Sequence, residues 1–483
     1  MAESFKNTVV NSFIWKFLEQ CGAGGAQLII GIILARLLLP EDYAILIIAT
    51  VFITLSQIFI DSGFSSALIQ KKEITDADTS SVFYISLCVS ILLYGVIFLA
   101  SPLIADIYDE PLLIPVLRVL SLTLLIGVIS SMQKVFISRN FQFKKQFIVS
   151  IIAALISGII GIVLAFMGYG VWALVGQQLT SAVLIALTLQ ILVGWKPKLL
   201  FSLTRTKSLF SFGWKLLISS LIHQMYDSIR NLTIGAFYDK PSLAFYNKGE
   251  EYPKFLSSSL DGTVQAVLFP AYAKYQDDKK ALKFMLSKAL STNAFITFPA
   301  MFGLAAVAEP FVSLLLTDKW LFCVPFLQIF CIYYALQPIT SANLAAIKAI
   351  GRTDTLLRLE IIKKIIGYSC LICTLPFGVM TVAVGALVSK TLAVLINGYP
   401  NTRLLGYTYK EMLKDLSPSI LLSAIMAGIV YSIQFLGFSA LVTLCIQIPV
   451  GIIFYFGAAK LLRMKTLDFA VSTVLDYVKS LRK

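Results

Sequence analysis

The chain has 483 residues, of which 58% are hydrophobic and 14% are charged, and its mean hydropathy is +0.84. Because soluble domains carry about 25% charged residues, this composition excludes a soluble protein covered by polar surface. The formal net charge of +14 would suggest a nucleic-acid partner in a soluble chain, but in a membrane protein it predicts basic loops on one membrane face.

The apolar residues fall in runs of roughly 18 to 28, each long enough for a helix to cross the hydrocarbon core of a bilayer. The sequence therefore predicts an all-α polytopic membrane protein with about 14 transmembrane helices. The loops between these helices are short, which argues against a large catalytic loop. In chain order, the predicted spans are 12–37, 43–68, 82–104, 113–137, 147–167, 171–194, 212–238, 243–270, 284–306, 322–346, 357–377, 380–400, 417–435 and 438–461.

Basic residues are distributed unequally between the two sets of loops. Twenty Lys and Arg residues lie in or beside the loops that follow even-numbered spans, and three, Arg36, Lys240 and Lys319, lie in the loops that follow odd-numbered spans. Since basic loops stay on the cytoplasmic side, we predict that both termini are cytoplasmic. The acidic loop around Asp109 and the turn around Tyr169 are then outside.

An internal repeat is visible at an offset of about 200 residues. Residues 13–16 in the first span are similar to residues 212–215 in the seventh, and residues 168–171 are similar to 376–379. A repeat of six spans keeps both copies in the same orientation, which is a parallel repeat about an axis along the membrane normal. The predicted domains are an N-lobe (1–200), a C-lobe (207–405), two additional spans (406–464) and a cytoplasmic interfacial helix (465–483).

Polar side chains recur along one face of the seventh span. Two interpretations remain open: a cavity lining between the two lobes, or a self-neutralising structural stripe in which Asp227 pairs with Arg230. The first span carries a similar stripe, where small residues favour close helix packing equally well, and the eighth span adds charged residues of both signs. The predicted substrate-cavity residues are Lys16, Glu19, Gln20, Gln27, Lys215, Ser219, His223, Gln224, Asp227, Arg230, Asn231, Lys248 and Glu251.

Two acidic residues in corresponding positions of the repeat, Asp61 and Asp261, are each followed by glycine, at Gly63 and Gly262. By the helix rise, each lies roughly 25 Å along its helix from the outer turn. We therefore predict a helix-end or hinge role for these four residues rather than contact with substrate.

Motifs for catalysis or cofactors are lacking in the sequence. No Ser/His/Asp constellation or Walker loop is present, so we predict neither an enzyme nor ATP hydrolysis by this chain. His223 is the single histidine, which excludes a multi-histidine metal site. We predict no catalytic residues, no metal and no cofactor.

Several stretches resemble a known family. These are 36–43, 61–63 with 69–74, 246–248, 269–278 and 318–327. They are similar to the bacterial polysaccharide flippases, the Wzx-type transporters of the MOP superfamily, and above all to the colanic-acid-exporter branch. The resemblance implies a protein of the bacterial cytoplasmic (inner) membrane. It implies alternating-access transfer of an undecaprenyl-diphosphate-linked oligosaccharide to the periplasmic leaflet for O-antigen, capsule or exopolysaccharide synthesis.

Further partners and two alternative functions remain open at this point. H⁺ or Na⁺ could couple to transport through Glu19 or Asp227, and the polysaccharide polymerase machinery could contact the chain. A MATE-like cation or drug antiporter would share the fold but would need a net acidic cavity, whereas the stripes here are partly basic. A membrane-embedded polysaccharide polymerase would need a large outer loop, which the sequence lacks.

Overall fold

All regular secondary structure in the part of the chain that the computed structural model describes is helical, and no strand occurs there. Within these described residues, ten helices are long and apolar enough to cross a membrane, which confirms the predicted polytopic helical membrane protein. The count of fourteen spans stays a prediction. The described residues are 15, 18–61, 64–71, 74–274, 278–350, 352–464 and 466–467, and within these ranges some side chains of helical residues fall outside the description.

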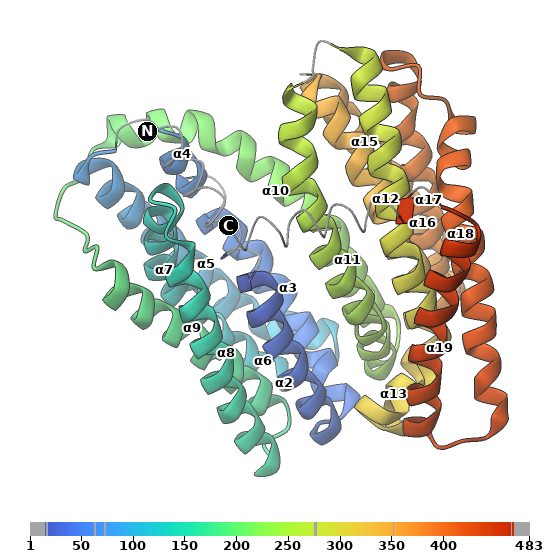
Figure 1. The fold of residues 1–483 in the computed structure, drawn as a ribbon. Coiled ribbons are helices and arrows are strands. Elements are labelled where there is room, and N and C mark those ends of the chain that lie inside the picture. The colour runs from blue at the N-terminus through green and yellow to red at the C-terminus, as the bar shows by residue number, and fades with distance from the viewer. Residues whose placement is uncertain are drawn as a thin grey trace. The chain divides into compact units, whose positions relative to one another are not determined.

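Contacts divide the chain into two compact units, Met1–Ala244 and Phe245–Lys483. In the first unit, coloured blue to green in Figure 1, α8 packs along α9 and α2, and α10 packs on α3, α4 and α5. The elements of this unit are η1 (Glu19–Ala23), α2 (Gly24–Leu37), α3 (Pro40–Asp61), α4 (Phe64–Gln70), α5 (Asp76–Ile107), α6 (Leu113–Leu120), α7 (Leu122–Arg139), α8 (Phe143–Phe166), α9 (Val171–Val193), α10 (Leu203–Phe237) and the start of α11 (Lys240–Lys274).

Polar contacts fix the helix ends of the first unit. Thr75 and Asp78 form a capping box at the start of α5, which satisfies backbone N–H groups that the helix leaves without partners. Arg139, the last residue of α7, donates from Nη1 to the carbonyl oxygens of Leu68 at 2.8 Å and Ile69 at 3.1 Å. The guanidinium therefore joins the end of α4 to the end of α7.

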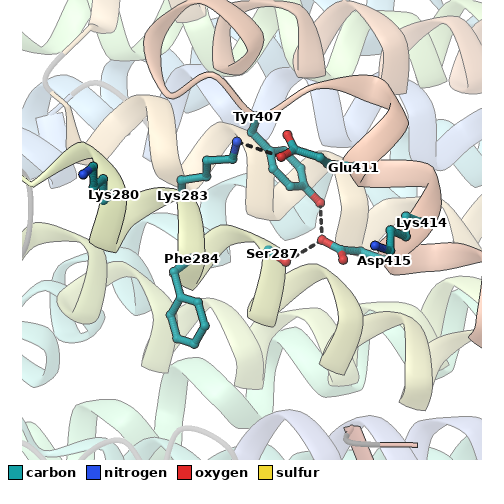
Figure 2. A pocket seen from close by; sticks show the side chains of 8 residues that line it. All are labelled: Lys280, Lys283, Phe284, Ser287, Tyr407, Glu411, Lys414 and Asp415. Carbon is teal, nitrogen blue, oxygen red and sulfur yellow. Dashed lines mark hydrogen bonds and ion pairs between the residues drawn. The ribbon is translucent and has the colours of Figure 1, made fainter.

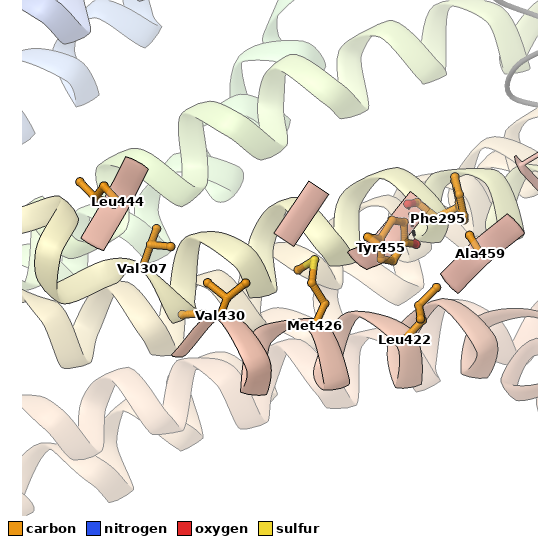
Figure 3. Close-up of a cluster of buried hydrophobic side chains, with 9 residues drawn as sticks. Phe295, Val307, Leu422, Met426, Val430, Leu444, Tyr455 and Ala459 are labelled. Carbon is orange, nitrogen blue, oxygen red and sulfur yellow. Dashed lines mark hydrogen bonds between the residues drawn. The ribbon is translucent and has the colours of Figure 1, made fainter. Parts of the chain in front are cut away.

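The second unit has its core where α12, α18 and α19 meet (Figure 3). Phe295 of α12 packs with Met426 of α18 and Tyr455 of α19, and the Tyr455 hydroxyl donates to the Phe295 carbonyl at 2.9 Å. The last two helices are thus part of this unit's core. The elements of the unit are the remainder of α11, α12 (Lys279–Ala306), α13 (Ala308–Leu316), η2 (Asp318–Cys323), α14 (Val324–Ala335), α15 (Gln337–Ala349), α16 (Thr353–Thr374), η3 (Leu375–Phe377), α17 (Val379–Leu404), α18 (Tyr409–Ser432), η4 (Ile433–Leu436) and α19 (Ala440–Leu461).

Some predicted spans overlap more than one helical element. The span predicted at 43–68 overlaps α3 (Pro40–Asp61) and α4 (Phe64–Gln70), and residues 62–63 between them lie outside the described part of the chain. The span at 322–346 is divided between α14 and α15, where Pro338 follows the break and lacks the N–H that a continuous helix needs. The short helix α13, in a loop of the prediction, was not predicted.

The two contact units differ from the lobes that the repeat predicts. The boundary between the units follows Ala244, because α10 packs on α3, α4 and α5. The lobes 1–200 and 207–405, and the added pair of spans at 406–464, stay predictions about the repeat. Of the interfacial helix predicted at 465–483, only residues 466–467 belong to the described part of the chain.

Candidate functional site

In the first unit, the candidate residues of α10 are concentrated near its C-terminal half. Asp227 and Arg230 form an ion pair one turn apart, with 3.6 Å between Asp227 Oδ1 and Arg230 Nη2. Their exposure differs, since the side chain of Arg230 is 2% exposed and that of Asp227 is 35% exposed. The Tyr226 ring lies 5.8 Å from the guanidinium carbon. The pairing that the sequence left open is therefore present, and its acidic member is the accessible one.

The other predicted residues of α10 differ in accessibility. Ser219 is exposed, and Gln224 and Asn231 are half-buried. The stripe therefore includes side chains that are open to the surroundings as well as the buried Arg230. The side chains of Lys215 and His223 lie outside the description.

A second polar group of the first unit is built around Glu19. The residue begins η1, a π-helical turn of the kind that is frequent at functional sites. Its Oε1 accepts hydrogen bonds from two side chains of α8, Gln146 Nε2 at 2.9 Å and Ser150 Oγ at 3.3 Å. Glu19 is therefore held against α8 by uncharged donors.

The remaining predictions for the first span fall partly outside the described residues. Lys16 lies outside them, as does the side chain of Gln20. Gln27 is exposed.

In the second unit, α11 carries a deeply buried lysine of the candidate set. Lys248, with 3% of its side chain exposed, places Nζ 2.8 Å from Glu251 Oε2. The same ammonium lies 5.9 Å from the Trp320 ring centre. Glu250 is directed elsewhere, because its Oε1 accepts a hydrogen bond from the Tyr334 hydroxyl at 2.7 Å. Ionic and aromatic groups are thus packed together inside a 35-residue helix and its neighbours.

The proposed hinge residues occupy different places in their helices. Asp61 is the last residue of α3 and accepts a hydrogen bond from Gln57 Nε2 at 2.8 Å. Asp261 lies inside α11, where its Oδ2 accepts from Ser341 Oγ at 2.6 Å. Asp61 is thus the last described residue before the undescribed residues 62–63, Asp261 lies within a helix, and the helix-end or hinge role stays a prediction. Gly63 lies outside the described residues, and Gly262 belongs to α11.

The sequence did not identify the partners of Glu19 on α8. Gln146 and Ser150 lie four residues apart, on one face of α8, and this spacing was the signal that could have found them. A further, partly buried contact was not predicted as a site. In it, Arg118 Nε donates to Ser101 Oγ at 3.0 Å and the guanidinium carbon lies 4.1 Å from the Phe98 ring centre.

The chain has relatives of known family. Residues 33–325 match a family described as polysaccharide biosynthesis protein. The lipopolysaccharide biosynthesis protein WzxC of Escherichia coli (strain K12) is 25% identical over 401 residues, which cover 82% of this chain and 80% of WzxC. The succinoglycan biosynthesis transport protein ExoT of Rhizobium meliloti (strain 1021) is 23% identical over 346 residues, which cover 71% of this chain and 70% of ExoT.

The fold also has a counterpart among solved structures. The lipid II flippase MurJ, in its inward closed conformation, is similar with a TM-score of 0.74 and 19% sequence identity. The match covers 95% of this chain and 98% of MurJ. At this identity the likeness shows the fold, and it confirms the predicted fold class.

Proposed function

The chain belongs to the polysaccharide biosynthesis protein family, and we propose on this premise that it is a flippase for lipid-linked sugar repeats of a surface polysaccharide. The substrate is an undecaprenyl-diphosphate-linked oligosaccharide, which moves from the cytoplasmic to the periplasmic leaflet. The names of WzxC and ExoT, which refer to polysaccharide biosynthesis and transport, and the MurJ-like fold support this proposal. The predicted resemblance to Wzx-type flippases is confirmed at the level of the family.

The observation that carries the proposal is the family match together with charged side chains buried in long helices. Arg230 in the first unit and Lys248 in the second are 2% and 3% exposed. Charged groups at membrane depth are costly and mark pathways for polar substrates. A diphosphate and its sugars need such groups, because hydrocarbon rejects them, whereas the prenyl chain stays in lipid.

The division of roles follows from the chemistry of the side chains. An arginine guanidinium binds phosphate with two parallel N–H donors, whereas a lysine ammonium acts as a point charge. We assign Arg230 to the diphosphate, with Asp227 as the partner that the phosphate replaces. The exposed and half-buried amide and hydroxyl groups of Ser219, Gln224 and Asn231 are assigned to sugar hydroxyls.

The proposal is tested by deleting the gene in its host. Lipid-linked repeat units are expected to accumulate on the cytoplasmic leaflet, and a plasmid copy of the gene is expected to restore export. Normal surface polysaccharide in the deletion strain, with no accumulation of the precursor, would contradict the proposed function.

We propose the orientation that the basic loops predict, with both termini in the cytoplasm. Single cysteines at Asp109 and Tyr169, in a version without the seven native cysteines, should react with an impermeant maleimide in intact cells. Cysteines at Lys144 and Lys279 should react only after the cells are permeabilised. Labelling at 144 or 279 in intact cells would contradict the proposed orientation.

Ion coupling is a further proposal, in which Glu19 or Asp227 exchanges H⁺ or Na⁺ during transport. Asp227 is the accessible member of its ion pair, and Glu19 has uncharged donors as its described α8 partners. Asp227→Asn or Glu19→Gln should then make the initial transport rate in vesicles insensitive to an imposed ion gradient. If the parent rate is unchanged when both gradients are collapsed, transport is driven by removal of the product and the coupling proposal fails.

A further inference from the structure

A cavity of about 420 Å³ with charged and apolar lining residues lies in the second unit, where α12 and α18 begin (Figure 2). This volume is within the range of small-ligand pockets in proteins, roughly 300–1,000 Å³. None of its residues belongs to the candidate substrate residues described above. The lining residues are Lys280, Lys283, Phe284, Ser287, Tyr407, Glu411, Lys414 and Asp415.

The two carboxylates of the cavity, Asp415 and Glu411, both interact with other residues of its lining. Asp415 Oδ2 accepts hydrogen bonds from the Tyr407 hydroxyl at 2.7 Å and from Ser287 Oγ at 2.5 Å. Burial and the neighbouring Asp415 carboxylate raise the pKa of Tyr407 well above its usual range, so the phenol keeps the proton that it donates. These contacts join the start of α18 to α12 and give the cavity a fixed polar wall.

The cavity lining also contains an ion pair between Lys283 and Glu411. Lys283 Nζ lies 2.8 Å from Glu411 Oε1 and also donates to the Gly406 carbonyl at 2.7 Å. Glu411 is the N3 residue of the capping box that Thr408 begins at the start of α18. The Glu411 carboxylate therefore both pairs with Lys283 and accepts the backbone N–H of Thr408 in the helix cap.

The other two lysines of the lining, Lys280 and Lys414, take no part in these interactions. The side chains of Lys280 and Lys414 are exposed, and neither ammonium group has an ion-pair or hydrogen-bond partner within the described ranges. With three lysines against two carboxylates, the lining has a net charge of +1. This net positive charge would attract an anion to the cavity.

The position of the cavity decides which anion is suitable. It lies at the first turns of two helices that are long and apolar enough to cross a membrane, Lys279–Ala306 and Tyr409–Leu436. Its apolar border is exposed, since Phe284 has 64% and the neighbouring Leu413 has 61% exposure. Both loops belong to the basic set that predicts the cytoplasmic face, where anionic lipids are enriched. A charged cavity with an apolar border at this level suits a lipid headgroup.

We propose that this cavity binds the phosphate headgroup of an anionic phospholipid in the cytoplasmic leaflet. Lys280 and Lys414, which lie at opposite sides of the cavity (Figure 2), attract the phosphate by their positive charge, and Phe284 and Leu413 lie beside the acyl chains. Lys283 is a positioning residue, because its bonds to Glu411 and Gly406 hold the α17–α18 loop that forms the rim. The site is separate from transport, so its test does not depend on the proposed flippase activity.

The test measures lipid binding to the purified full-length protein by native mass spectrometry, during titration with phosphatidylglycerol or phosphatidylcholine. The double variant Lys280→Gln/Lys414→Gln should bind phosphatidylglycerol roughly five- to thirtyfold more weakly than the parent. Phosphatidylcholine binding should not change. The matched control Lys134→Gln/Lys196→Gln removes two exposed lysines that belong to the same basic set but lie outside the cavity, and it should bind both lipids as the parent does.

Further titrations distinguish a phospholipid headgroup from other phosphate-containing ligands. Inorganic phosphate should not displace phosphatidylglycerol at equal concentration, because it lacks the acyl chains. The proposal is overturned if the cavity variant binds phosphatidylglycerol as tightly as the control variant. It is also overturned if inorganic phosphate competes equally, or if undecaprenyl diphosphate binds at this site and phosphatidylglycerol does not.

Discussion

Replacing Arg230 by alanine is expected to lower the rate of lipid-linked oligosaccharide transport by about 10- to 100-fold while the protein remains in the membrane. A hydrogen bond to a charged group contributes about 1.5–3 kcal/mol, which corresponds to this range of rates. Removing a fully buried ion partner can unfold a protein, but Asp227 is 35% exposed, so it can be solvated when Arg230 is absent. The measurement is the initial transport rate per amount of protein in the membrane.

Three companion variants separate substrate binding from a structural ion pair. Arg230→Lys keeps the charge without the planar fork, and it should recover only part of the activity. Asp227→Asn should retain more activity than Arg230→Ala. The exchange Asp227→Arg with Arg230→Asp keeps an ion pair at the same spacing, so full recovery in this double variant would show that the pair is structural and that Arg230 does not hold the diphosphate.

Replacing Gly249 by alanine is expected to cause the largest loss of folded protein among single conservative changes in the second unit. A Cβ atom at this position would lie 2.6 Å from Phe326 Cβ, 2.8 Å from the Leu327 amide nitrogen and 3.0 Å from the Cys323 carbonyl oxygen. Two of these atoms are backbone, so a rotamer change cannot relieve the overlap. Overpacking of this kind costs about 1–3 kcal/mol or more.

The matched control for this variant is Gly428→Ala in α18, where a Cβ atom would meet nothing within 4 Å. Because alanine favours helix over glycine, the control should be as stable as the parent or slightly more stable. The measurements are the amount of protein in the membrane and the thermal unfolding midpoint in detergent. Equal midpoints for Gly249→Ala and Gly428→Ala would show that α11 and α14 are not packed as described.

Much of the helical fold could be predicted because hydrophobic runs and turn residues are local signals. The turn between α8 and α9 is an example, since Gly168 and Gly170 adopt φ values of 80° and 54° that glycine accepts without strain. Breaks within apolar runs were missed, such as the one at Ser121 between α6 and α7. Hydropathy does not register such a break, because both sides of it are equally apolar.

The candidate site was predictable only where its partners lie on the same helix. Asp227 with Arg230 and Lys248 with Glu251 are three residues apart, and helix geometry alone makes each pair adjacent. The partners of Glu19 lie 127 and 131 residues away, and the Tyr334 hydroxyl reaches Glu250 from 84 residues away. Such contacts depend on which helices pack together, and a single sequence does not encode this as a local pattern.

The most direct test of the central claim is transport by the purified protein in reconstituted vesicles. An undecaprenyl-diphosphate-linked oligosaccharide is placed in one leaflet, and its appearance in the other is followed with an impermeant glycosidase. The account predicts transfer that depends on the amount of protein and that is about 10- to 100-fold slower with Arg230→Ala. Transfer at the rate of protein-free vesicles, by a protein that is folded and correctly inserted, would contradict the claim that the chain is a flippase.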